Sequence, residues 1–190
     1  SVIYVFFRDL RRKLESARAQ LEEAATTDSL TGIRNRRFVL ESFNAEIAEA
    51  ARTQAPLCCA ITDADDFKRV NDELGHGSGD LALKAIASIL AAGVRPYDIA
   101  GRYGGEEFIL VFPHTSKAEA LAACERLRRD VESQASPRVP GLKRPLTISI
   151  GIAELQSGDA GAEALLARAD AGLYRAKAAG KNRCAYQEKT

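Results

Sequence analysis

The first 24 residues repeat apolar positions at alternating spacings of four and three, and charged residues fill the positions between them. About three such heptads predict a helix that pairs with a second chain as a coiled coil. The alanines make this seam weak, so a solvated amphipathic helix remains an alternative. The segment VIYVFF would also suit the last strand of an upstream domain, because β-branched and aromatic residues favour strands. The seam residues are Ile3, Phe7, Leu10, Leu14, Ala17, Leu21 and Ala24.

Beyond residue 25 the pattern predicts helices and strands in alternation. Turn and N-cap residues (TTDSLTG) come first, and Pro56 and Pro96 each end a helical register. The order β-α-β-β-α-β, with an added terminal helix and strand, predicts an α/β sandwich in which helices pack against one mixed or antiparallel sheet. The expected helices span 36–52, 81–94, 117–134 with Thr115 as its cap, and 162–180; the expected strands span 57–62, 98–103, 107–112, 146–154 and 184–186, and a polar turn spans 71–79.

Composition narrows the class of protein. The chain has 190 residues, 46% of them hydrophobic, and a net charge of +1, which fits one soluble domain with an extension and gives no reason to expect a DNA, RNA or anionic membrane partner. No apolar run approaches the roughly 20 residues of a membrane span. The four cysteines lack a C-x-x-C pair, so reduced thiols are expected rather than zinc or disulfides. Reduced thiols fit a cytoplasmic segment. The chain contains no methionine, so we expect a piece of a longer protein, with membrane attachment of the parent left open.

Two acidic residues fall at the ends of predicted strands. Asp63 closes the strand LCCAIT, and Glu106 opens the strand that follows the Gly-Gly turn of a predicted hairpin. Mg²⁺ prefers carboxylate oxygens, a backbone carbonyl and substrate phosphates, which these residues and a carbonyl next to Asp63 would supply. Side chains alternate along a strand, so Glu107 needs a different role from Glu106. The alternative for each residue is an ordinary solvated loop acid.

The segment NDELGHGSGDLALK places three glycines before a helix whose N-terminus favours an anion. It matches neither the P-loop nor the G-x-G-x-x-G pattern, so a nucleotide site of those types is not expected. His76 is interpreted as a local hydrogen-bonding residue. Asn71 and Asp80 offer an amide and a carboxylate, which suit a guanine edge or, alternatively, a helix cap.

Together these residues resemble the GGDEF-domain diguanylate cyclases. Gly104–Phe108 reads GGEEF, the glutamate variant of the family signature, and further motifs follow the family order. The resemblance covers about Thr26 to Tyr186. It implies a ferredoxin-like, nucleotidyl-cyclase palm domain at residues 26–190 with a central mixed, mostly antiparallel sheet, preceded by a signalling helix at 1–25. The other similar motifs are DSLTGIRNRR, DADDFKRVND, GHGSGD, LTISIGIAE and ADAGLYRAKAAGKN.

The resemblance implies an enzyme that condenses two GTP molecules into cyclic di-GMP and two pyrophosphates across a homodimer. It implies Mg²⁺ or Mn²⁺, two ions in each half-site, held by Asp63, Glu106 and the carbonyl of Ala64, with Glu107 as a supporting catalytic acid. Two departures from the family pattern are Lys181, commonly arginine, and Asp66, whose charge is expected to repel phosphate mildly. The implied substrate-binding residues are Asp66, Phe67, Lys68, Lys177 and Lys181 for the triphosphate, Asn71 and Asp80 for guanine, and Gly104 and Gly105 at the turn.

The sequence RPYD supplies Arg95 and Asp98 shortly before the signature, and it is similar to the R-x-x-D site at which the family binds its product as an inhibitor. An arginine can hold a guanine edge or a phosphate through two parallel hydrogen bonds. The resemblance adds Arg126 from a neighbouring surface. A surface ion pair of little energetic consequence is the alternative interpretation of Arg95 and Asp98.

The resemblance also gives the N-terminal helix a role. Each domain would bind one GTP and make half of a two-fold symmetric product, so a coiled coil over residues 2–24 would bring two domains together and transmit a signal from an upstream sensory domain. Three other functions stay open: a catalytically silent receptor for GTP or cyclic di-GMP, a coiled-coil interaction module with a structural domain, and a cyclase with relaxed base choice.

Overall fold

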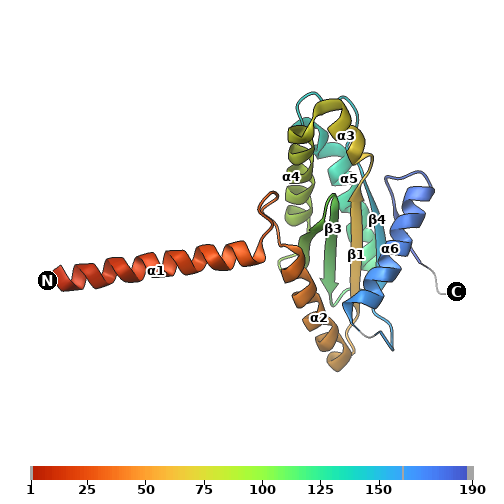
Figure 1. Cartoon of the computed structure of the whole chain (residues 1–190). Helices are drawn as coiled ribbons and strands as arrows, with labels where there is room; N and C mark the ends of the chain where they lie inside the picture. Colours follow the sequence, from red (N-terminus) through yellow and green to blue (C-terminus); the bar gives the residue numbers. More distant parts are fainter. Residues whose placement is uncertain (1, 160, 188–190) are drawn as a thin grey trace.

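The computed structural model describes residues 2–159 and 161–187, with side chains described except at positions 2, 3, 6 and 19–23. In this part of the chain, five strands form one sheet covered by helices on both faces (Figure 1). The strands are β1 (Leu57–Ala64), β2 (Ile99–Gly104), β3 (Glu107–Pro113), β4 (Ile148–Glu154) and β5 (Cys184–Tyr186). The helices are α1 (Val2–Thr26), α2 (Arg36–Thr53), α3 (Phe67–Leu74), α4 (His76–Gly93), α5 (Lys117–Gln134) and α6 (Ala162–Ala178), with a short 3₁₀ helix at Ser136–Arg138.

The sheet has the order β2-β3-β1-β4-β5. Neighbouring strands are antiparallel except β4 and β5, which are parallel, so the predicted mixed, mostly antiparallel sheet is confirmed. Every residue of the central strand β1 is buried. Residues of α4 and α5 pack on one face of the sheet and residues of α2 and α6 on the other. The continuous apolar run of β1 is therefore explained by helices on both sides.

Helix α6 lies unusually close to strand β4. A Cβ added to Gly151 of β4 would lie 1.9 Å from the carbonyl oxygen of Ala169 and 2.1 Å from the amide nitrogen of Leu173, both in α6. Only a residue without a side chain permits this approach. The position of α6, which carries Lys177 near its end, therefore depends on Gly151.

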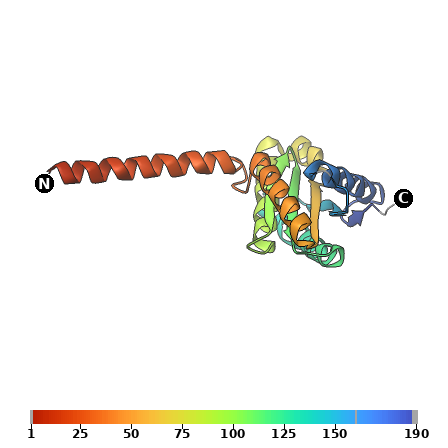
Figure 2. The same cartoon turned by 90° about the horizontal axis from the view of Figure 1, so that it is seen from below.

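Helix α1 extends away from the sheet and its covering helices (Figures 1 and 2). VIYVFF is helical, so the strand alternative for this segment is wrong. The side chains of Tyr4, Phe7 and Leu14 are 69%, 62% and 69% exposed, whereas those of the seam residues Ile3 and Leu21 lie outside the described ones. No helix among the described residues is both long and apolar enough to cross a membrane. The helix thus presents exposed apolar side chains, Tyr4 and Leu14 among them.

Two local predictions are wrong. The segment 71–79 is not a turn: α3 runs through Asn71 to Leu74, the chain bends at Gly75, whose φ is +84°, and α4 begins at His76. The cap of α5 is Ser116, not Thr115, because Ser116 and Glu119 form a reciprocal capping box. The hydroxyl of Thr115 instead donates to the carbonyl of Pro113.

Candidate active site

The acidic end of β1 lies against α6. Asp63 is on the same sheet face as Ile61, and its Oδ1 lies 2.9 Å from Nζ of Lys177. Burial raises the pKa of Asp63 to about 6, the hydrogen bond and charge of Lys177 oppose the rise, and the charges of Glu106 and Glu107 add to it. An acid that is buried beside two other acids and one lysine is in a place where additional positive charge would be stabilising.

The hairpin that carries GGEEF brings both glutamates to Asp63. Strand β3 begins at Glu107, which confirms the predicted start of the strand at 107, and Glu106 lies in the preceding turn rather than opening the strand. Glu107 is the cross-strand partner of Asp63, and the amide of Ala64 donates to the carbonyl of Glu106 at 3.3 Å. Directly opposite residues of a sheet share a face, so Glu107 projects to the Asp63 side.

The carboxylates of Asp63 and Glu106 and the carbonyl of Ala64 fit a hard divalent cation such as Mg²⁺. Among the described residues no group of three or more His, Cys, Asp or Glu side chains is arranged to hold a metal. The expected ligand set needs fewer side chains, since it combines Asp63, Glu106 and the Ala64 carbonyl with oxygens of a bound phosphate. The raised pKa of Asp63 supports this fit, because a cation would relieve the crowding of negative charge.

An arginine that the sequence analysis did not identify holds the turn of the GGEEF hairpin. Nε and Nη2 of Arg102 donate to the carbonyl of Gly105 at 3.1 and 2.8 Å, and Nη1 donates to Asp28 at 3.1 Å. The side chain of Arg102 is 17% exposed. Gly105 has a φ of +51°, a conformation that favours glycine. The turn is therefore fixed to the DSLTG segment that follows α1.

The turn after β1 approaches the loop after α6. Asp66 has a φ of +54° and directly precedes α3, whose first backbone amides lack intrahelical acceptors. Its carboxylate pairs with Nζ of Lys181 at 2.5 Å, and this hydrogen bond leads the causes that lower the pKa of Asp66. The Asp66 charge is thus matched by Lys181, although the sequence analysis considered only its repulsion of phosphate. Lys68 is exposed on the first turn of α3.

The proposed guanine-reading residues lie on the two helices that join at Gly75, Asn71 in α3 and Asp80 in α4. The side chain of Asn71 lies so close to Gly79 that a Cβ there would be 2.0 Å from Oδ1 of Asn71. Asp80 follows Gly79 in α4 and is exposed. Gly79 is therefore needed to leave room for the amide of Asn71.

The R-x-x-D residues and Arg126 line one cavity of about 400 Å³ between the end of α4 and α5. Oδ2 of Asp98 accepts the Arg95 amide at 2.8 Å, while its Oδ1 is buried and has no hydrogen-bond partner among the described residues. Burial raises the pKa of Asp98 against the opposing effects of the Arg95 amide and the charges of Arg95 and Arg126. A buried acceptor without a partner is one that a ligand donor can satisfy.

Comparison with known proteins identifies similar chains. Residues 25–183 match the family model described as diguanylate cyclase, GGDEF domain. The chain is 40% identical over 161 residues to the response regulator PleD of Caulobacter vibrioides, a stretch that covers 84% of this chain and 36% of PleD. It is 42% identical over 156 residues to diguanylate cyclase DosC of Escherichia coli, covering 82% of this chain and 34% of DosC. The chain thus spans about a third of the length of these relatives.

Solved structures show the same architecture. The coiled coil and GGDEF domain of DgcB from Caulobacter crescentus, in complex with c-di-GMP, matches with a TM-score of 0.84 at 32% identity, covering 97% of this chain and 99% of that one. The active GGEEF domain of a diguanylate cyclase from Vibrio cholerae matches with a TM-score of 0.76 at 33% identity, covering 82% of this chain and 98% of that one.

Proposed function

Because the chain belongs to the GGDEF-domain family of diguanylate cyclases, we propose that it condenses two GTP molecules into cyclic di-GMP and two pyrophosphates. The observation that carries this proposal is the buried Asp63, whose pKa is raised beside Lys177 and the two glutamates of the GGEEF hairpin. Structural neighbours that contain c-di-GMP support the same class of nucleotide.

In the proposed reaction, the ribose 3'-hydroxyl of each GTP attacks the α-phosphate of the other. Each attack forms one phosphorus–oxygen bond, breaks the bond to the β-phosphate, and releases pyrophosphate and the hydroxyl proton. Diguanylate cyclases of this family generally use divalent metal ions, and we propose two Mg²⁺ or Mn²⁺ ions in each half-site, at Asp63, Glu106 and the carbonyl of Ala64. Such ions would offset phosphate charge and lower the pKa of the attacking hydroxyl.

The protein's own residues would bind and orient GTP. Lys177 pairs with Asp63 near the end of β1, and Lys181 pairs with Asp66 in the turn after β1. Both lysines would therefore offset the charge of a triphosphate bound at this turn. The amides of Asp66 and Phe67 lie at the beginning of α3, where a helix N-terminus favours an anion. At Gly104 and Gly105 no atom lies within 4 Å of the place that a Cβ would occupy, which permits close approach of a ligand. Asn71 and Asp80 would bond the guanine edge, and Glu107 would support the reacting groups.

Two copies of the domain would have to face each other, since one domain with one GTP makes half of the product. We assign the pairing surface to the apolar face of α1, where Tyr4, Phe7 and Leu14 are exposed. The structure of the coiled coil and GGDEF domain of DgcB supports this assignment. The Arg102 contacts with Asp28 and Gly105 would connect the end of α1 to the catalytic turn, as required for control by an upstream sensory domain.

The direct test of the proposed function separates turnover from binding. The chain is incubated with GTP and Mg²⁺, the nucleotides are resolved by chromatography, and GTP and cyclic di-GMP binding are measured in parallel. Cyclic di-GMP formation supports the cyclase. Binding without product would instead identify a receptor, and absence of both would identify a scaffold.

The Gly79→Ala substitution is expected to raise the KM for GTP by about tenfold, because the new Cβ displaces the Asn71 amide from the position beside α4. Steady-state kinetics at saturating Mg²⁺ measure this change. Gly77→Ala is the matched control, since nothing lies within 4 Å of the Cβ at that position. Equal kinetics for the two variants would reject the guanine-binding role of Asn71.

The Arg95→Ala substitution is expected to raise the concentration of cyclic di-GMP that halves the rate by about tenfold or more, because paired hydrogen bonds from a guanidinium are lost. Initial rates with added product measure it. The control is Arg129→Ala, which removes an exposed arginine from α5. Unchanged inhibition in Arg95→Ala would show that the cavity lined by Arg95, Asp98 and Arg126 is not the inhibitory product site.

A further inference from the structure

The loop between α6 and β5 holds two consecutive residues in the left-handed conformation. Lys181 has a φ of +62° and Asn182 a φ of +47°. Asparagine tolerates this region because its short amide can bond locally, whereas lysine has no such compensation. Lys181 is held in this conformation by its own backbone amide, which donates to the carbonyl of Ala176 at 3.0 Å, together with contacts made by the rest of the loop.

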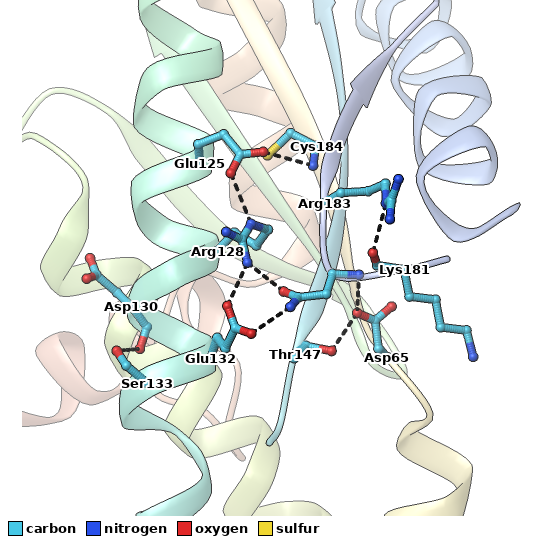
Figure 3. Close-up of polar contacts among 11 residues, drawn as sticks. Asp65, Glu125, Arg128, Asp130, Glu132, Ser133, Thr147, Lys181, Arg183 and Cys184 are labelled. Atoms are coloured by element: carbon cyan, nitrogen blue, oxygen red, sulfur yellow. Dashed lines mark hydrogen bonds and ion pairs between the residues drawn. The ribbon is translucent and has the colours of Figure 1, made fainter. Parts of the chain in front are cut away.

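Asn182 makes these contacts in two directions. Its backbone N–H donates to Oδ2 of Asp65 at 3.0 Å. Its side-chain Oδ1 accepts from Nη1 of Arg128 at 2.7 Å, and its Nδ2 donates to Oε1 of Glu132 at 2.8 Å. We call Asp65, Arg128, Glu132 and Asn182 the Asn182 cluster. Figure 3 shows Arg128 and Glu132 projecting from α5 toward the loop, with Asp65 on its other side.

The partners of Asn182 are themselves immobilised. Asp65 is 4% exposed and also accepts the hydroxyls of Thr147 at 2.8 Å and Ser149 at 2.6 Å. The side chain of Arg128 is 12% exposed, and its Nε donates to Glu125 at 3.0 Å. A loop bonded to two buried groups that are themselves hydrogen-bonded to other elements has little freedom to move.

The Asn182 cluster joins the two sides of the proposed triphosphate site. Asp65 directly precedes Asp66 at the beginning of α3, and Asn182 directly follows Lys181, whose Nζ bonds Asp66. We propose that Asn182 is a positioning residue, which holds Lys181 against the N-terminus of α3 so that its charge meets the triphosphate of GTP. This inference rests on the proposed function, and it concerns a residue that would not touch the substrate itself.

The test combines a double-mutant cycle with amide exchange. In Asn182→Ala, the KM for GTP is expected to rise about three- to tenfold with kcat within about twofold, because ground-state binding of the triphosphate is lost. The double variant Asn182→Ala/Lys181→Ala is expected to have the same KM as Lys181→Ala alone, since both substitutions remove the same contribution of Lys181 to GTP binding. Amide hydrogen exchange at residues 180–184 is expected to be faster in Asn182→Ala than in the wild type.

Two further variants and three outcomes decide the inference. Asn182→Gly can adopt the left-handed conformation and keep the bond to Asp65 but cannot reach α5, so its KM should rise as well; a wild-type KM would overturn the proposal. Asn44→Ala is the control, because Asn44 joins α2 to the other end of α6 through the amide of Ala162. Multiplicative effects in the double variant would also overturn the proposal. Unchanged exchange refutes it whether or not GTP is used, whereas a wild type without GTP turnover refutes the proposed function alone.

Discussion

Replacing Glu106 with Gln, or Asp63 with Asn, is expected to lower the rate of cyclic di-GMP formation by about three orders of magnitude or more. Each change removes a negative charge from the point where the β1 end meets the GGEEF turn, and with it a ligand for the cation that a triphosphate requires. Initial rates of product formation from GTP and Mg²⁺ measure the loss. The control is Glu41→Gln, which neutralises an exposed acid on α2.

The loss in Asp63→Asn should occur without loss of stability. Because burial raises the pKa of Asp63 from 3.8 to about 6, the ionised form is disfavoured in the folded state by up to about 3 kcal/mol without a bound cation. This penalty is complete above about pH 6 and declines as the pH falls toward 3.8. At pH 7.5 the metal-free variant should therefore melt at the same temperature as the wild type or higher. A variant that retains turnover, or that is inactive because it is unfolded, would contradict the assignment.

The largest expected effect on stability belongs to Gly151→Ala. Its Cβ would overlap the backbone of α6 at Ala169 and Leu173, and backbone atoms cannot move aside as the end of a flexible side chain can. We expect the free energy of unfolding to fall by about 3 kcal/mol or more. Urea titrations followed by circular dichroism measure this quantity.

The control for Gly151→Ala is Gly77→Ala, which adds a methyl group to a helix in open space and should be neutral or stabilising by up to about 1 kcal/mol. Similar stability for the two variants would show that α6 can move away from β4. In that case the place of Lys177 beside Asp63 would not depend on the close contact at Gly151.

Most of the sheet could be predicted from the sequence because its strands combine apolar runs with local turn signals. The hairpin of β2 and β3 follows from its Gly-Gly pair, and strand β1 follows from an apolar run that ends in acidic residues. Helix α3 was missed because three nearby glycines indicate a turn. Only Gly75 serves that purpose, with a φ of +84°, whereas Gly79 lies inside α4 to make room for Asn71. Glycine thus had two different physical roles within five residues.

The contacts that organise the site could not be predicted, since they join residues far apart in the chain. Arg102 binds Asp28 across 74 positions, and Asn182 binds Asp65 across 117. The pairing of Asp66 with Lys181, 115 positions away, likewise depends on where β1 and the end of α6 lie in the fold. The motifs identified the residue types at the site, and only the arrangement of the strands and helices shows which of them meet.

The measurement that tests the central claim most directly is the fate of GTP labelled at its α-phosphate. After incubation with the chain and Mg²⁺, the account predicts that the label passes into cyclic di-GMP, with one pyrophosphate released for each GTP consumed and no product from Glu106→Gln. Label that remains in GTP bound to the protein, or that appears in GMP, would contradict it.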